Sequence, residues 1–133
     1  MKNLILILSA GLLMIFTFDS CKKEAGQGGN CTITGKVFVK NYNGTFTQLL
    51  EEYYDPGVWV YIIYGDNKDY SDRIETSYDG TYEFQFLRPG TYHVYAYSKD
   101  STRQTTAPIG VIKDVEIKKR SETVEVPDLV IFN

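Results

Sequence analysis

The sequence predicts an all-β protein built as a single antiparallel β-sandwich of seven strands. Beyond residue 31, apolar and polar residues alternate with a period of two, the pattern of strands that have one buried face. Turn signals made of Gly, Pro, Asn and Asp separate these segments at intervals of roughly eight to twelve residues. No stretch of this region carries apolar residues at helical spacing. Together these observations favour a sandwich over a helical or mixed domain.

The first predicted strand covers residues 33–40, where one face is apolar and the other mostly polar. The apolar face consists of Ile33, Gly35, Val37 and Val39. Residues 41–55 then form a long connection, and residues 58–64 form the second strand. In this second strand the core-facing side chains are Val58, Val60 and Ile62. A polar turn over residues 65–69 leads to a short strand over residues 74–77.

The most regular part of the sequence predicts two alternating strands, over residues 81–87 and 91–97. They are joined by a Pro-Gly turn, which indicates a hairpin. Two later strands cover residues 110–117 and 122–132. Because Pro127 has no N–H to donate, the last strand is expected at a sheet edge or with a bulge.

Residues 1–20 have the pattern of an export signal. Lys2 precedes an apolar run over residues 4–18, and Ser20 is a small residue directly before Cys21. The run is shorter than the ~20 residues needed to cross a bilayer. A small residue before a cysteine resembles the lipobox of bacterial lipoproteins, in which that cysteine is acylated and becomes the mature N-terminus. The alternatives are an ordinary cleaved secretory signal and a retained membrane helix.

Two further segments follow the predicted signal. Residues 21–30, with lipidated Cys21, are polar and glycine-rich and predict a flexible tether. Residues 31–133 are enough for one domain. If Cys21 carries lipid, Cys31 has no internal partner, which excludes a disulfide framework.

Charge and the predicted anchor indicate where the protein works and with what. The formal net charge is -3, and no block of like charge is long enough to indicate nucleic acid as a partner. We expect a chain held by its N-terminal lipid in the bacterial cell envelope. Lys22-Lys23, in place of an Asp at the second mature position, favours the outer membrane by analogy with Gram-negative lipoprotein sorting.

Four motifs of the predicted domain resemble the carboxypeptidase regulatory-like family. The motifs are Ile33-x-Gly35-x-Val37, Pro56-Gly57-Val58-x-Val60, Asp79-Gly80-Thr81-Tyr82-x-Phe84-x-x-Leu87-x-Pro89-Gly90-x-Tyr92-x-Val94 and Val126-x-Asp128-Leu129. This family is a seven-stranded, prealbumin-like β-sandwich related to transthyretin-like and Cna B-type modules. The resemblance implies a non-catalytic module for stability, adhesion or interaction.

The reactive groups in the sequence agree with a non-enzymatic protein. His93 is the sole histidine, and no Gly-x-Ser-x-Gly motif accompanies it. One His with one free Cys cannot supply the four ligands of a structural zinc site. We therefore expect no catalytic residue, no metal and no cofactor. The favoured function is an interaction or structural module that engages another envelope protein, with an enzyme as the weakest option.

Aromatic residues on the outward side of two strands are the candidate ligand site. If the alternate positions face the core, one strand turns Trp59, Tyr61 and Ile63 outward. The other turns His93, Tyr95 and Tyr97 outward. Planar rings on a sheet can stack on sugar rings or anchor a protein partner. The alternative function is therefore a carbohydrate-binding lipoprotein that captures glycans with these rings.

A second interpretation of the same residues is purely structural. Aromatic residues favour strands in general. The connection over residues 41–55 could also fold over the aromatic face and bury it, because it carries several large apolar side chains. These are Leu49, Leu50, Tyr53 and Tyr54.

Overall fold

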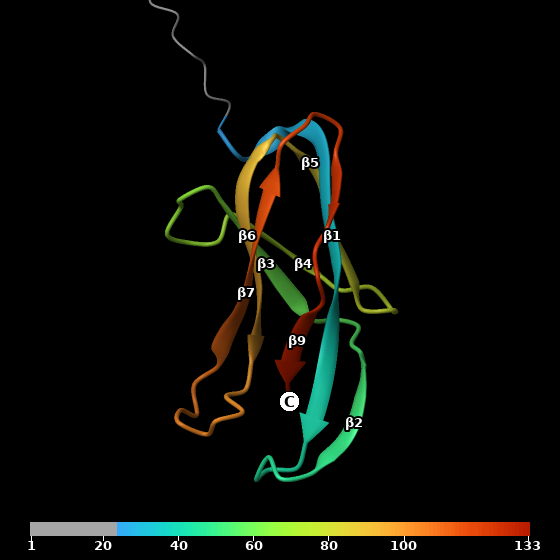
Figure 1. The fold of residues 1–133 in the computed structure, drawn as a ribbon, viewed down its shortest axis with the longest axis vertical. Coiled ribbons are helices and arrows are strands. Elements are labelled where there is room, and N and C mark those ends of the chain that lie inside the picture. Colours follow the sequence, from blue (N-terminus) through green and yellow to red (C-terminus); the bar gives the residue numbers. More distant parts are fainter. Residues whose placement is uncertain (1–23) are drawn as a thin grey trace, which may run out of the picture.

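The structure is a computed structural model that describes residues 24–133, so the predicted signal over residues 1–20 and Cys21 lie outside the described residues. The described part contains nine strands and no helix, hence none that is long and apolar enough to cross a membrane. The strands are β1 (Gln27–Tyr42), β2 (Leu49–Tyr54), β3 (Trp59–Tyr64), β4 (Asp72–Glu75), β5 (Thr81–Leu87), β6 (Gly90–Ser98), β7 (Ile109–Ile117), β8 (Thr123–Glu125) and β9 (Leu129–Phe132). They form a five-stranded and a four-stranded sheet that face each other as in a β-sandwich (Figure 1). The fold class is as predicted, but the count of seven strands is not.

Strand β1 is the centre of the five-stranded sheet because it pairs with all four other members. Its first half pairs antiparallel with β5, and its second half pairs antiparallel with β2. Both β8 and β9 pair with β1 in parallel. The prediction of a wholly antiparallel sandwich is therefore wrong. Pro127 interrupts the last predicted strand as expected, since it lies between β8 and β9.

The four-stranded sheet has the order β4-β3-β6-β7, with every pair antiparallel. The predicted hairpin of β5 and β6 does not form. β5 pairs with β1, whereas β6 pairs with β3 and β7, so the Pro-Gly turn carries the chain from one sheet to the other. Alternation identifies the buried face of a strand, but it does not say whether the next strand lies beside it or across the core.

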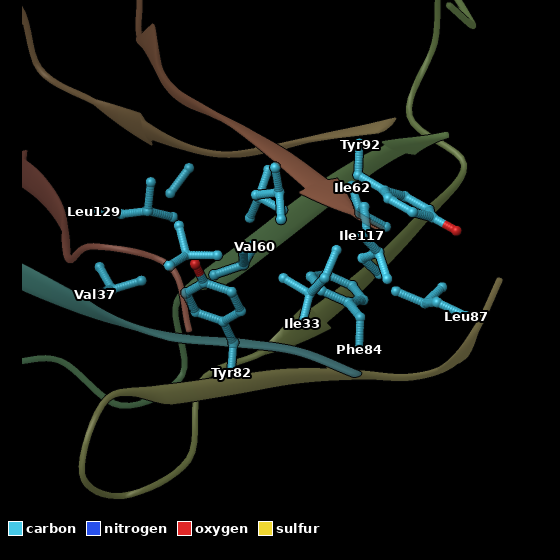
Figure 2. Packing of buried hydrophobic residues seen from close by; sticks show 14 of the residues in the cluster. Ile33, Val37, Val60, Ile62, Tyr82, Phe84, Leu87, Tyr92, Ile117 and Leu129 are labelled. Atoms are coloured by element: carbon cyan, nitrogen blue, oxygen red, sulfur yellow. The ribbon is translucent and has the colours of Figure 1, made fainter. Parts of the chain in front are cut away.

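The core lies between the two sheets and is formed by the predicted alternating positions. In Figure 2, Ile33 and Phe84 of one sheet point toward Ile62 and Ile117 of the other. Alternation is broken in β5, where Phe86 has a φ of 59° and is exposed to solvent. Leu87 is thereby turned into the core. 

The connection over residues 41–55 contains strand β2, which sequence analysis did not predict. Tyr54 pairs with Phe38, Tyr53 with Val39 and Glu52 with Lys40, all on β1. The Tyr54 and Phe38 rings meet edge to face at 5.1 Å. Two glutamates and two exposed leucines gave this segment no alternating pattern, so nothing in its sequence indicated a strand.

The ordered domain begins earlier than the predicted tether allows. Residues 27–30 belong to β1, and Arg88 N–H donates to the carbonyl of Gly26. A Cβ added to Gly29 would lie 2.1 Å from the carbonyl oxygen of Leu87. The glycines of this segment therefore permit close packing against β5, whereas composition alone suggested flexibility.

Candidate functional site

The outer face of the four-stranded sheet carries a group of aromatic side chains. We call this group the aromatic cluster; it consists of Trp59, Tyr61, Tyr70, Tyr95 and Tyr97. Strand register explains it, because Tyr61 of β3 lies directly opposite Tyr95 of β6, with inward-facing neighbours on both sides. The prediction that β3 and β6 turn Trp59, Tyr61, Tyr95 and Tyr97 away from the core is confirmed, whereas Tyr70 was not predicted.

Tyr61 is the centre of the aromatic cluster. Its ring stacks on Tyr95 with centroids 5.0 Å apart and an interplanar angle of 12°. Tyr70 and Tyr97 meet Tyr61 edge-on, at 5.1 Å and 5.4 Å. Tyr97 also meets Tyr95 edge-on at 5.6 Å. Offset-stacked and edge-to-face pairs are the favourable arrangements of aromatic rings, so the four tyrosines hold one another in place.

The edges of the aromatic cluster are accessible to solvent. Trp59 is 40% exposed, Tyr70 49% and Tyr97 50%, whereas Tyr61 and Tyr95 are half-buried beneath them. The guanidinium carbon of Arg73 lies 4.2 Å from the centroid of the Trp59 ring, within the range of a cation–π contact. The cluster thus has a fixed base and a rim that a ligand can reach.

The predicted cover of this face by residues 41–55 is wrong. Strand β2 pairs with β1 in the five-stranded sheet, so the residues expected to cover the aromatic cluster lie in the opposite layer (Figure 1). Leu49, Leu50 and Tyr54 are themselves exposed there. The outward rings therefore form an open surface among the described residues.

His93 and Ile63 continue the face beyond the tyrosines. His93 lies opposite Ile63 on β3 and opposite Asp114 on β7. Its Nδ1 is 2.6 Å from Oδ1 of Asp114, so the imidazole is held by a cross-strand contact. Ile112 of β7 lies opposite Tyr95 and adds an exposed apolar side chain to the same face. The sequence predicted that His93 lies on this face, but it did not predict the contact with Asp114.

The phenol group of Tyr95 is a neutral hydrogen-bonding group within the aromatic cluster. Burial, followed by the neighbouring Tyr97, raises the pKa of Tyr95 to about 12. Tyr95 therefore stays protonated at physiological pH and can both donate and accept a hydrogen bond. Ring faces together with uncharged hydroxyls suit a ligand that has apolar C–H surfaces and many hydroxyl groups.

A cleft of about 760 Å³ lies at one end of the sandwich. We call it the end cleft. It is bounded by the β1–β2 turn, the β6–β7 loop and the end of β9, which lie together in Figure 1 at the end opposite the start of β1. Its apolar lining is Phe46, Val58, Tyr97, Pro108, Ile131 and Phe132. Tyr97 belongs to both the aromatic cluster and this cleft, so the two surfaces adjoin.

Sequence reasoning missed three parts of this arrangement. Tyr70 and Arg73 come from the β3–β4 connection and β4, where no alternation marked a face. The end cleft is assembled from loops far apart in the sequence, so no local signal could have indicated it. Within residues 24–133, no group of three or more His, Cys, Asp or Glu side chains is placed to hold a metal ion.

Comparisons with known proteins give likeness of fold alone. No protein family model matches this sequence, and no curated protein matches it. Among solved structures, a provisionally assigned carbohydrate binding protein from Pseudomonas aeruginosa is similar with a TM-score of 0.52 and 15% identity, over 80% of this chain and 91% of that one. A minor pilin of Streptococcus agalactiae gives a TM-score of 0.44 and 14% identity, over 81% of this chain and 45% of the pilin chain. This chain therefore spans less than half of the pilin chain, and that likeness supports no argument about function.

Proposed function

We propose that this protein is a non-enzymatic carbohydrate-binding module that takes a glycan on its aromatic cluster. The observation that carries the proposal is the open set of rings around Tyr61, with Trp59, Tyr70 and Tyr97 accessible at its rim. Stacking of sugar C–H faces on such rings, with hydrogen bonds to phenol hydroxyls, is a chemistry that this surface can supply. The Pseudomonas protein of similar fold is provisionally assigned as a carbohydrate binding protein, which supports the same proposal.

The test is retardation of the full chain in gels that contain starch, xylan, β-glucan or pectin. The chain is purified in a detergent without a sugar headgroup, because such a headgroup would compete for the rings. We expect one of the polysaccharides to retard the wild-type protein. Retardation by none of the four would contradict the proposal.

Three variants assign binding to the aromatic cluster. Trp59→Ala and Tyr97→Ala remove rim rings that are about half exposed, so each should weaken retardation about tenfold or more with little change in melting temperature. Tyr78→Ala is the matched control, since Tyr78 is 91% exposed in the β4–β5 connection, away from the cluster. Equal retardation of all three variants and the wild type would place the glycan elsewhere.

A protein partner is the second candidate, and strand β7 favours it. Among the described residues β7 pairs only with β6, which leaves its other side free along nine residues. Ile109 and Ile112 are exposed on this strand. Free edge strands can accept a strand from another protein. Cross-linking in intact cells from a cysteine placed at Lys113, followed by partner identification, tests this candidate. Recovery of the chain without any cross-linked envelope protein would count against it.

We also propose that the chain is a lipoprotein of the carboxypeptidase regulatory-like type, attached through Cys21 to the outer membrane of a Gram-negative bacterium. The signal pattern, the small residue before Cys21 and the four motifs support this. Radiolabelled palmitate should enter the wild-type chain in cells and should not enter Cys21→Ser. Equal labelling of both chains, or of neither, would contradict the anchor.

A further inference from the structure

The end cleft contains polar groups that the fold itself does not use. The carboxylate of Asp55 is half-buried between β2 and β3, and among the described residues no hydrogen bond or ion pair holds it. Across the cleft, the β6–β7 loop contributes Arg103, whose guanidinium also has no internal partner in residues 24–133. An acceptor and a cation thus lie in one apolar-walled space.

Both loops that bound the cleft are held in defined conformations. The Asp100 carboxylate accepts the hydroxyl of Thr102 and the backbone N–H groups of Thr102, Gln104 and Thr105. The Asn43 side chain accepts two N–H groups in the β1–β2 turn. Because the loops are ordered without a ligand, binding would cost little conformational entropy.

Two cleft residues also adopt a backbone conformation that side chains disfavour. Phe46 has a φ of 54° and Arg103 a φ of 60°, although neither is glycine. The left-handed region is disfavoured for a residue with a side chain, because its Cβ lies too close to the following carbonyl oxygen. Phe46 packs its ring beside Tyr42 and Phe132, at 5.8 Å and 6.5 Å. Phe46 and Arg103 lie on loops that connect strands of opposite sheets. Phe46 therefore adds a ring on one side of the end cleft, and Arg103 adds a cation on the other.

We propose that the end cleft binds the terminal sugars of the glycan whose inner units lie on the aromatic cluster. This inference rests on the proposed function and adds a second subsite to it. Tyr97 is shared by both surfaces, so a chain that crosses the tyrosines leads to the cleft. The volume of about 760 Å³ lies within the range of ligand pockets. Rings of Phe46 and Phe132 contact the sugar faces, Asp55 accepts from sugar hydroxyls and Arg103 donates to them.

The experiment compares a polymer with its hexasaccharide, which has a far larger share of chain ends. The polymer is the polysaccharide of the four that retards the wild-type chain most, and the affinity of its hexasaccharide is measured by calorimetry on the full chain. Arg103→Gly removes the cation and keeps a residue that accepts the left-handed conformation. Asp55→Asn removes the charge of the acceptor at constant size. Each should weaken hexasaccharide binding about tenfold and change polymer retardation less than twofold.

The matched control is Ser121→Gly, because Ser121 has a φ of 57° in the β7–β8 connection at a different site. It should bind the hexasaccharide as the wild type does. If the cleft variants also bind it as the wild type does while Trp59→Ala does not, the cleft inference fails and the proposed function stands. If the cleft variants lose binding to the polymer and to the hexasaccharide equally, the inference that the cleft recognises the chain end fails. Absence of all binding by the wild-type chain would overturn both proposals.

Discussion

Two buried tyrosines should respond in opposite directions to the same substitution. Tyr82 of β5 is 1% exposed, and its hydroxyl has no hydrogen-bond partner among residues 24–133. Its side chain points into the core in Figure 2. Burial raises the pKa of this phenol, so the group stays neutral and its cost is that of a desolvated hydroxyl. Tyr82→Phe removes the unsatisfied oxygen and keeps the ring.

The size of the stability change expected for Tyr82→Phe follows from the burial of its hydroxyl. A buried polar group without a partner costs about 1–3 kcal/mol. Loss of some packing around the oxygen reduces the gain, so we expect Tyr82→Phe to raise the free energy of unfolding by about 1 kcal/mol. For a domain of this size that corresponds to a rise in melting temperature of roughly 4 °C. Calorimetry and urea unfolding of the two proteins measure both quantities.

Tyr92 is the matched control for the opposite sign. Its buried hydroxyl accepts from the N–H of Gly26 at 2.9 Å and donates to the carbonyl of Arg88. Tyr92→Phe leaves both backbone groups without this partner, so it should lower the free energy of unfolding by about 1–3 kcal/mol. The reasoning is refuted if Tyr82→Phe is destabilising by 1 kcal/mol or more, because its hydroxyl would then have a hydrogen-bond partner in solution.

The remaining predictions concern packing and pH. Gly35→Ala should lower stability by about 1–3 kcal/mol, since the added Cβ would lie 2.5 Å from the Tyr82 hydroxyl; an unchanged urea midpoint would show that the ring can move aside. Hydrogen bonds from Ser77 and then Thr81 lower the pKa of Asp79 to about 2, below its ordinary value of 3.8. Its stabilising effect is therefore complete above pH 4 and is lost as the pH falls through about 2, and unfolding curves of Asp79→Asn should show a weaker acid dependence in that window. Hydrogen bonds from Thr102 likewise lower the pKa of Asp100, so Asp100→Asn should unfold at lower urea concentration at pH 7 and converge with the wild type in acid; parallel curves at every pH would contradict this.

The alternation of apolar and polar residues made it possible to predict which face of each strand is buried. It thereby predicted that most rings of the aromatic cluster point outward. Val60 and Ile62 are buried as expected, which places Tyr61 outward with no further information. The same rule places Tyr95 and Tyr97, because Val94 and Ala96 are buried. These positions depend only on local alternation, which a single sequence displays.

Pairing between distant segments was not predictable in the same way. Strand β2 has no alternating pattern, and it is a strand because β1 offers it partners. β8 and β9 lie parallel to β1 because the chain returns from the other sheet, a property of topology and not of their residues. Tyr70 and the end cleft follow from such long-range arrangements. For the same reason, composition misjudged residues 27–30, whose glycines fit against β5.

The central position of β1 has a consequence for the order in which the protein can acquire its structure. Among the described strands β1 is synthesised first, and one of its sides pairs with residues 123–132, which are synthesised only after β2 to β7. Pairings of such high sequence separation fold slowly, because a long loop must close before they form. Until residues 123–132 are synthesised, one edge of β1 stays unpaired and open to aggregation. A chaperone that shields this edge until these residues are available would therefore be expected to raise the yield of native protein.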